Sequence, residues 1–397
     1  MDFFQALSVY FVWHPLDDED VRPLIEHCYQ HLSKNIEKPF SRSMNLPIFF
    51  RTSCTCDVPE QIVIKSEKTI AFLFVSKEVA IDENWIEYLK SISTNAGIQC
   101  VPIALDKNSL TLGKDLANIN FIRAYDFQRE FYKELLFISV SHEIFRYSLN
   151  DLFKEKSLGK DNSLKLFISH AKDGAKGIQL AEELKTYIDN SAMRNFFDAT
   201  DIAPGYRFDA EIENNIKEST IISINSDIYS SRYWCQREIL YAKESERPII
   251  AVDILDEFED RRFPYSSNIP CVHAHIAEGV ERKDILRILT TALLETIRFN
   301  YSKLMLVKLR ELGIVEAHTV ILPRPPEAFD VRNIISSDNG MLTKLKEKFL
   351  YPEPPLYNEE IECLQKVGLT FVTPLSINPV NLDNVKIGLS ISEPSDY

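Results

Sequence analysis

The sequence predicts an α/β protein made of parallel β-sheets that follow one another along the chain. Short apolar runs rich in Ile, Val and Phe alternate with longer segments whose apolar residues recur every three to four positions. The first pattern is typical of buried strands, and the second of helices that cover a sheet. The alternation occurs over residues 1–153 and again over 165–300, so we expect two such domains in tandem, followed by a Pro-rich C-terminal extension.

The second half carries the clearer pattern. Helix-like segments at 178–188 and 207–219 separate apolar runs that we expect to form strands. These runs lie in the segments KLFISHAKDG (165–174), RNFFDATDIAPGYRF (194–208), STIISINSDIYSSRYWCQREIL (219–240) and RPIIAVDIL (247–255). An amphipathic segment at 283–299 follows, and its apolar stripe predicts the helix that closes the domain.

Trp234 and Glu238 are the most informative pair in this half. Their spacing of four residues places an aromatic ring and a carboxylate on one face of the helix expected there. A flat ring can stack on a base or a pyridinium, and an acid beside it can hold a ribose, so the pair suits nucleotide chemistry. The alternative is a Trp packed under the sheet and a Glu in solvent.

Three motifs of the second half, taken together, resemble the bacterial form of the Toll/interleukin-1 receptor (TIR) domain family. They are ISHAKD (168–173), FFDATDIAPG (196–205) and SRYWCQREI (231–239). The resemblance covers about residues 164–300, roughly a third of the chain, and implies a flavodoxin-like parallel sheet. The family contains enzymes that cleave NAD as well as protein-binding adaptors, so the family name leaves both functions open.

The TIR resemblance implies that Glu238 is the catalytic residue of an NAD glycohydrolase and that Trp234 stacks on the nucleotide. Cleavage of the nicotinamide–ribose bond builds positive charge on the ribose, and a carboxylate held against its hydroxyls favours that charge. Nicotinamide leaves as a neutral molecule, so one carboxylate can suffice. NAD is then the substrate, and no separate cofactor is implied. Because its role needs the ionised form, we expect Glu238 to face water or a ribose.

Further substrate-binding candidates lie in the loops expected to meet at the carboxyl ends of the strands. They are His170, Asp173, Phe197, Asp198, Gly205 and Arg207. Phe196 and Phe197 alternate along one strand, so only one of them can face the crevice. Arg207 could meet a diphosphate or pair with Glu211 on the next helical turn. Asp198 could equally cap a turn, and His170 could be structural.

The first half, residues 1–153, resembles a degenerate copy of the same domain. Its matching segments are VYFVWHPLDD (9–18), LPIFFRTS (46–53), KTIAFLFVSKEVAIDENWIEYL (68–89) and QCVPIAL (99–105). Trp85, however, is followed four residues later by Leu89, while Glu87 points away from the Trp face. We therefore expect a TIR-like fold without catalysis, used for assembly or recognition; an unrelated α/β domain is the alternative.

The remaining segments connect or extend these domains. Residues 154–164 are polar with Gly and Ser and predict a linker. Residues 301–383 read as a helical and Pro-rich connector, since Pro lacks a backbone donor and favours extended chain. Residues 384–397 resemble the first strand of a Rossmann-like nucleotide-sensing (SLOG) domain, in which case the natural chain would continue past residue 397.

Composition excludes several function classes. The 397 residues carry a net charge of −14 and no Lys/Arg-rich tract, which disfavours nonspecific nucleic-acid and membrane binding. No apolar run of about 18 residues predicts a membrane span, and the N-terminus lacks signal-peptide features. Seven scattered cysteines indicate reduced thiols and a cytoplasmic location. Cys54 and Cys56 lack a second pair at zinc-site spacing, so no metal is expected.

Three functions remain open on the sequence. The first is an NAD glycohydrolase that depletes NAD in anti-phage defence after activation and oligomerisation. The second is a synthase of a cyclic ADP-ribose-like signal that uses the same residues, and the third is a non-catalytic TIR scaffold. The expected partners are NAD, other copies of the TIR domain, and an activating protein or nucleotide signal.

Overall fold

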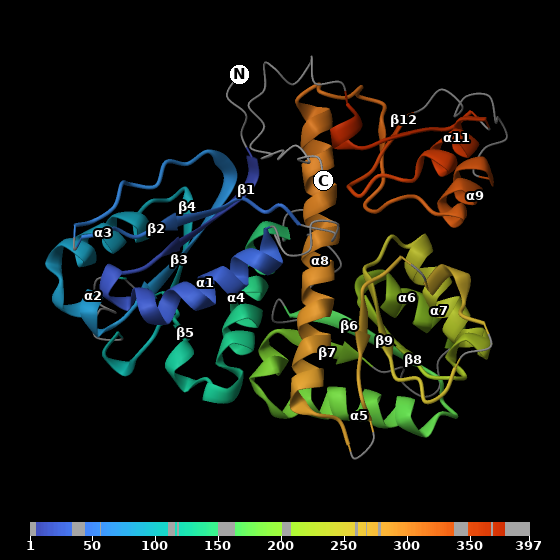
Figure 1. Ribbon diagram of the computed structural model, residues 1–397, viewed down its shortest axis with the longest axis horizontal. Helices are drawn as coiled ribbons and strands as arrows, with labels where there is room; N and C mark the ends of the chain where they lie inside the picture. The colour runs from blue at the N-terminus through green and yellow to red at the C-terminus, as the bar shows by residue number, and fades with distance from the viewer. Residues whose placement is uncertain are drawn as a thin grey trace, which may run out of the picture. The chain divides into compact units, whose positions relative to one another are not determined.

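The protein divides into two compact units, one comprising residues 1–137 and 300–397 and the other 138–299. Both divisions fall inside helices, α4 (Tyr132–Leu149) and α8 (Arg282–Glu311), which are labelled in Figure 1. The computed structural model describes residues 5–33, 44–55, 57–109, 116, 119–149, 163–200, 208–258, 261–266, 268–276, 279–336, 348–366 and 368–377.

The boundary between the two halves differs from the one expected at residues 154–164. Residues from Ile138 onward belong to the second unit, in which His142 of α4 makes an edge-on ring contact with Phe196 at 4.9 Å. Apolar packing of this helical segment thus moves the division upstream of the polar stretch. Of the expected linker, residues 154–162 lie outside the described part of the chain, and β6 already begins at Leu164.

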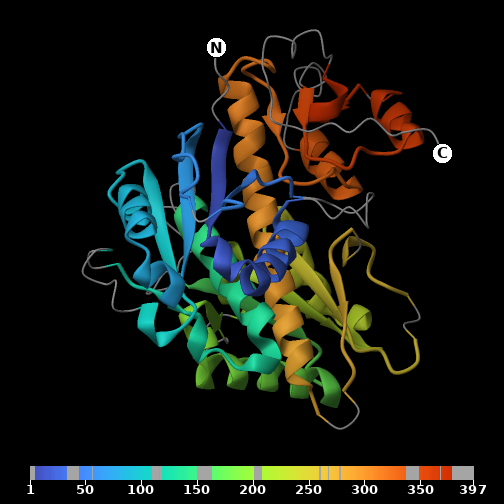
Figure 2. The same ribbon diagram turned by 60° about the vertical axis from the view of Figure 1, so that its left-hand side comes forward.

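A five-stranded parallel sheet forms the N-terminal part of the first unit. Its strands lie in the order β2-β1-β3-β4-β5, and Figure 2 shows them in blue to cyan. Nearly every residue of β1 and β3 is buried, as expected for central strands covered on both faces. The elements are β1 (Gln5–Val12), α1 (Asp18–Leu32), β2 (Ile48–Arg51), β3 (Ser66–Val75), α2 (Lys77–Ile81), α3 (Glu83–Ser93), β4 (Ile98–Ala104) and β5 (Ile122–Arg123).

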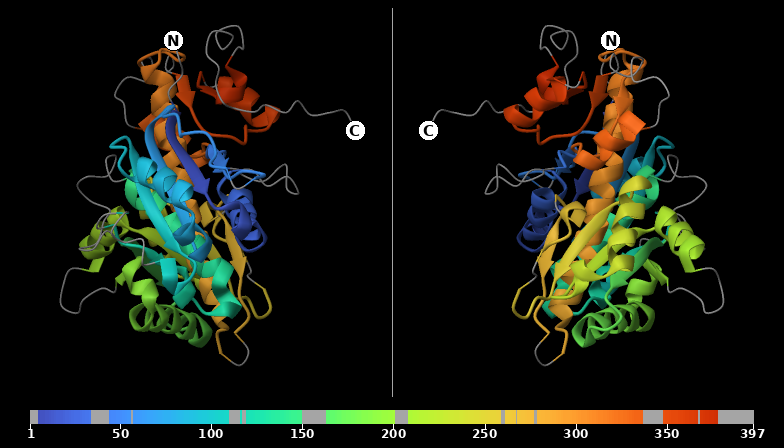
Figure 3. Two further views of the ribbon diagram at one scale, coloured as in Figure 1. Left: turned by 90° about the vertical axis from the view of Figure 1, so that its left-hand side faces the viewer. Right: turned by 90° about the vertical axis from the view of Figure 1, so that its right-hand side faces the viewer.

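The second unit contains a parallel sheet of the same kind, drawn in green to yellow in Figure 3. Its spatial order is β10-β9-β8-β6-β7, and β8 and β9 are buried along their whole length. The elements are β6 (Leu164–His170), α5 (Ala175–Asn190), β7 (Phe197–Thr200), α6 (Phe208–Glu218), β8 (Thr220–Asn225), α7 (Tyr233–Glu244), β9 (Ile249–Asp253), β10 (Cys271–His273) and α8.

The two sheets share one topology. Numbered within its own half, each has the order 2-1-3-4-5, which is the order of flavodoxin-like folds. This confirms the predicted fold class of two flavodoxin-like parallel-sheet domains in tandem. Helix α8 is the closing helix that the sequence predicts for the second half, with Ile285, Leu289 and Leu293 in the core.

The C-terminal segment contains more than the connector expected over residues 301–383. Three short parallel strands form a small sheet in the order β11-β12-β13, and Phe349 stacks on Phe371 with ring centroids 5.0 Å apart. Strands of two or three residues are too short for a periodic signal in the sequence. The elements are β11 (Val320–Ile321), α9 (Ala328–Ser336), β12 (Lys348–Leu350), α11 (Asn358–Lys366) and β13 (Thr370–Val372).

Two further expectations concern the C-terminal residues and the absence of membrane-spanning helices. Residues 384–397, expected to begin a further nucleotide-binding domain, lie outside the described residues. Among the helices that the structure does describe, none combines the length and the apolar character needed to span a bilayer.

Candidate functional site

Helix α7 is positioned by the chain that leaves β8. A short 3₁₀ turn, Tyr229–Ser231, follows the strand, and Arg232 precedes the helix in an extended conformation. The buried residues of α7 recur at intervals of one, three or four positions, so they share the inner face of the helix. They are Cys235, Glu238, Ile239, Ala242 and Lys243. Glu238 therefore lies on the face that packs against the sheet.

Glu238 ends a chain of hydrogen bonds that crosses from the helix to the sheet. Its Oε2 accepts a hydrogen bond from the Ser169 hydroxyl at the end of β6. The Ser169 Oγ is also 2.6 Å from the hydroxyl of Tyr229. A hydroxyl has one proton, so a Ser169 that donates to Glu238 must accept from Tyr229. The donors thus run from Tyr229 through Ser169 to the carboxylate.

Burial dominates the electrostatics of this carboxylate. Glu238 is only 8% exposed. Desolvation raises its pKa to about 7, against the opposing effects of the Ser169 hydrogen bond and the charge of Lys172. Of the two surroundings expected for Glu238, water and a ribose, the structure excludes water. Burial also raises the pKa of Tyr229, which remains a neutral donor.

Trp234 lies one helical turn before Glu238 and is partly buried. It packs against an apolar cluster that joins β6, α6 and α7 and includes Phe167, Ile212 and Ile239. Its ring also makes an edge contact with Tyr233, at 5.4 Å between centroids, and Tyr233 is 66% exposed. Part of the Trp234 surface thus serves the core, as in the structural alternative, while the remainder stays accessible beside Glu238.

His170 is the last residue of β6 and Asp173 lies in the loop after it, and the contacts of both side chains are with groups other than the Glu238 carboxylate. Side chains alternate along a strand, so His170 points to the face opposite that of Ser169. A Cβ built on Gly177 of α5 would lie 3.8 Å from the His170 Cβ, which places this histidine against α5. Asp173 pairs with Arg232, whose Nε is 3.1 Å from its Oδ1. This pair fastens the loop after β6 to the start of α7.

The remaining candidates follow the second strand of this half. Phe197 is 1% exposed and belongs to the core, while Phe196 contacts His142. Asp198 is partly buried within β7, in register with Lys165. Gly205 and Arg207 lie outside the described residues, as does the side chain of Glu211. The described part of the site therefore brings together Glu238, Trp234 and the loop after β6, but not Phe197.

Ser169 and Tyr229 are site residues that sequence reasoning missed. Ser169 stands inside the ISHAKD motif, and Tyr229 lies two residues before the SRYWCQREI motif, in the turn that precedes α7. Their role was hidden because 60 residues separate them and only the pairing of β6 with β8 brings them together. The alternation in β6 offered one signal, since Ser169 shares a face with Phe167 and occupies a buried position with a polar side chain.

A cavity of about 770 Å³ lies beside the N-terminal turn of α7. Ser230, Gln236 and Arg262 are among its polar lining residues, and Phe258, Phe263 and Tyr265 supply aromatic surface. Neither Glu238 nor Trp234 lines it. This cavity is therefore distinct from the surface over the buried carboxylate.

The corresponding place in the first half is filled differently. Trp85 is fully buried, and its ring lies edge-on to that of His14 at 5.1 Å between centroids. Leu89, one helical turn later, is 2% exposed and belongs to the same apolar cluster. Apolar packing thus occupies the position where the second half holds a carboxylate.

One family model matches part of the chain. A family model described as a TIR domain matches residues 166–287, and no curated protein matches the chain. The chain is similar to the solved C-terminal domain of glucosamine-fructose-6-phosphate aminotransferase from Francisella tularensis, with 9% identity, 76% of this chain and 85% of that chain covered, and a TM-score of 0.20. The chain is also similar to apo D-lactate dehydrogenase from Escherichia coli, with 11% identity, 77% of this chain and 97% of that chain covered, and a TM-score of 0.15. TM-scores this low carry no argument about fold or function.

Proposed function

We propose that this chain, whose residues 166–287 match a family model of the TIR domain, is a TIR-type NAD glycohydrolase that cleaves the bond between nicotinamide and ribose. The observation that carries the proposal is the carboxylate of Glu238, buried at the end of a hydroxyl chain where β6 ends. In open α/β sheets, ligands bind at this carboxyl edge. A pKa raised to about 7 by burial is also typical of functional sites.

The chemistry follows from the charge that develops on the ribose. As the C1′–N bond breaks, nicotinamide leaves with the bonding electrons and becomes neutral, and positive charge develops on the sugar. An ionised Glu238 that accepts hydrogen bonds from the ribose hydroxyls favours this charge most strongly in the transition state. Water then adds to C1′ and releases a proton. Ser169 binds Oε2, so Oε1 is the oxygen that would receive the ribose.

Burial of Glu238 also bears on activation. At 8% exposure the carboxylate cannot meet a ribose until substrate or a partner uncovers it. We therefore expect little NAD cleavage by dispersed protein and more when copies associate or an activating protein or nucleotide binds. Depletion of cellular NAD after such activation is the anti-phage role that we assign to the enzyme.

A second role, assembly without catalysis, is favoured by the first half of the chain. This half keeps the 2-1-3-4-5 strand order, but the buried Leu89, four residues after Trp85, stands where the second half has Glu238. We propose that residues 1–153 act in assembly or recognition while the second half carries out the chemistry.

The decisive experiment is to measure nicotinamide release from NAD by the purified full chain at high concentration, with and without a crowding agent. Glu238→Ala and Glu238→Gln are the test variants. Glu244→Gln is the matched control, because Glu244 is an exposed residue of the same helix. We expect release in the wild type and in the control and its loss in both test variants.

The co-product decides between the two enzymatic readings. Linear ADP-ribose indicates hydrolysis, whereas a product lighter by one water molecule indicates that the ribose closed on the adenine and that the enzyme makes a cyclic signal. Turnover that persists in both Glu238 variants would remove this residue from the site. Absence of release in every condition would favour the scaffold function.

A further inference from the structure

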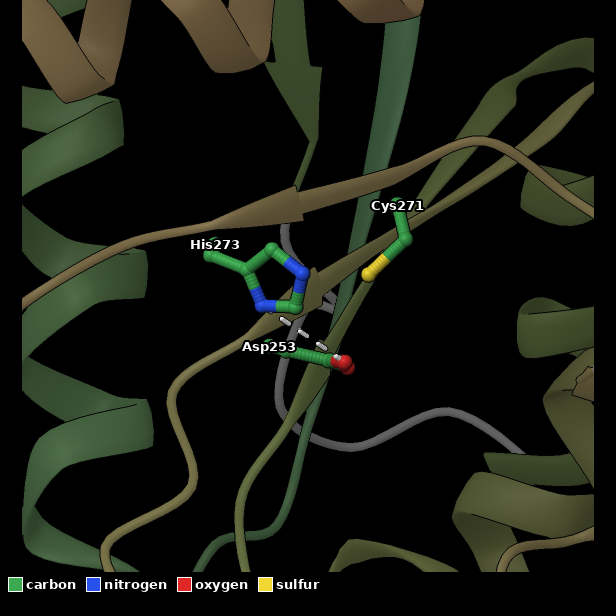
Figure 4. Close-up of side chains that lie close together, drawn as sticks. All are labelled: Asp253, Cys271 and His273. Atoms are coloured by element: carbon green, nitrogen blue, oxygen red, sulfur yellow. Dashed lines mark ion pairs between the residues drawn. The ribbon is translucent and has the colours of Figure 1, made fainter.

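A second group of reactive side chains lies on the last two strands of the second sheet. Strand β10 pairs with β9 so that His273 lies beside Asp253 and Cys271 beside Ala251. The Cys271 and His273 side chains, two residues apart, share one face of β10. Figure 4 shows both directed toward Asp253. One ligand atom from each of the three residues lies within 4.8 Å of the other two.

The donor set defines the class of ion that could bind. A thiolate sulfur, an imidazole nitrogen and a carboxylate oxygen are the three ligand types that zinc takes in proteins. Magnesium and calcium take oxygen ligands, which the Cys and His do not supply. Three protein ligands leave the fourth tetrahedral position to water. We propose that Asp253, Cys271 and His273 form a zinc-binding site.

Contacts around Asp253 already hold the carboxylate in place for a metal. Asn225, at the end of β8, donates to its Oδ1 from Nδ2 at 3.0 Å. A hydrogen bond from a neighbouring residue to a metal ligand holds that ligand in the orientation needed for binding. The Asn225 side chain is 1% exposed, and within the described part of the chain its Oδ1 has no hydrogen-bond partner. On the other side, His273 Nδ1 is 4.0 Å from Asp253 Oδ2.

Arg262 is the competitor of the proposed ion. Its Nη2 is 2.8 Å from both oxygens of Asp253, so the guanidinium now neutralises the carboxylate. The side chain of Arg262 is 39% exposed and also lines the cavity beside α7. A bound zinc ion would take over the carboxylate, and the guanidinium would turn toward the cavity. Removing Arg262 should therefore strengthen metal binding, a direction that a purely structural Arg262–Asp253 pair does not predict.

Zinc would also change the edge of the sheet. Strand β10 has three residues and lies at the end of the strand order, where β9 is its one neighbour among the described strands. Cys271 and His273 of β10 and Asp253 of β9 would bind the same zinc ion. The ion would thereby hold the edge strand β10 to β9 in addition to the hydrogen bonds between the two strands. Ligands that bind only the folded state stabilise it, so zinc should raise the thermal midpoint of the second unit.

The test is metal binding by the full chain, independent of NAD cleavage. Metal-free protein is titrated with Zn²⁺ by calorimetry and with Co²⁺ as a spectroscopic probe, in which a thiolate-to-cobalt absorption reports sulfur ligation. Cys271→Ser and His273→Ala should abolish binding of one equivalent, and Arg262→Gln should lower its dissociation constant.

Control variants remove thiol and imidazole groups elsewhere. Cys54→Ser and Cys363→Ser change other exposed cysteines, and His318→Ala changes an exposed histidine. These three should bind as the wild type does. Thermal unfolding without metal verifies that each variant is folded. Absence of Zn²⁺ binding in the wild type, binding retained in Cys271→Ser, or weaker binding in Arg262→Gln would each overturn the proposal.

Discussion

Replacing Glu238 by Gln removes the charge of the buried carboxylate while keeping the size of the side chain. Burial raises the pKa of this group from 4.5 to about 7. One pKa unit corresponds to about 1.4 kcal/mol, so ionising Glu238 costs the folded state at most about 3.5 kcal/mol. The Gln variant avoids this cost, and we expect it to be more stable than the wild type above pH 7.

The difference should depend on pH in a defined direction. Because folding raises the pKa, the folded protein binds this proton more tightly than the unfolded chain does. The wild type therefore loses stability as the pH rises from 4.5 to about 7, and no further change from this group follows above that range. Gln does not titrate, so the two proteins should differ least near pH 4.5 and most above pH 7.

Native-state hydrogen exchange can measure this difference in a chain with two units. Peptides from the buried strand β8 report opening of the second unit, and peptides from β3 report the first unit as an internal reference. Comparing the two proteins at the same pH cancels the intrinsic exchange rates. Equal protection of β8 in both proteins at pH 8, or lower protection in Glu238→Gln, would refute the assignment of a buried, costly carboxylate.

Nicotinamide release should rise with pH through about 7, because only the ionised form of Glu238 favours positive charge on the ribose; a profile without a step in this range would contradict that role. Ser169→Ala removes a hydrogen bond that lowers the pKa of Glu238, so the midpoint of the profile should move to higher pH, and an unchanged midpoint would exclude the coupling. Tyr229→Phe should lower the free energy of unfolding of the second unit by about 1 kcal/mol, measured by hydrogen exchange. An unchanged free energy would show that the hydrogen bond of the Tyr229 hydroxyl does not stabilise the fold. Leu89→Ala should cost the first unit about 2–5 kcal/mol by β3 exchange and leave release unchanged at a concentration where the protein is folded; reduced release would give the first half a part in catalysis.

Much of the fold was predictable because the central strands are long and apolar. Segments such as IIAV in β9 and AFLFV in β3 are buried on both faces, and this leaves an unbroken apolar run in the sequence. The shared strand order follows from repeated runs at similar spacing. Short edge strands such as β5 and β10 carry no such run, and they were not foreseen.

The site was only partly predictable for a related reason. Helical spacing places Glu238 one turn after Trp234, and that local geometry could be inferred. Burial of Glu238 depends instead on Ser169 and Tyr229, which the pairing of β6 and β8 brings to α7. The proposed zinc ligands depend in the same way on the register between β9 and β10, whereas the sequence drew attention to Cys54 and Cys56.

The hydroxyl chain beside Glu238 has a consequence for how its proton is accommodated. When the carboxylate is ionised, Tyr229 donates to Ser169 and Ser169 donates to Glu238. Ser223 lies on the other side of the Tyr229 hydroxyl, and its own proton is already given to the carbonyl of Ile250 at 3.1 Å, so it can accept. When Glu238 takes up a proton, each hydroxyl can turn and the whole chain reverses direction, ending on Ser223. The buried acid can thus gain or lose a proton while the surrounding hydrogen bonds adjust by rotation of hydroxyl hydrogens, with every heavy atom around it in place.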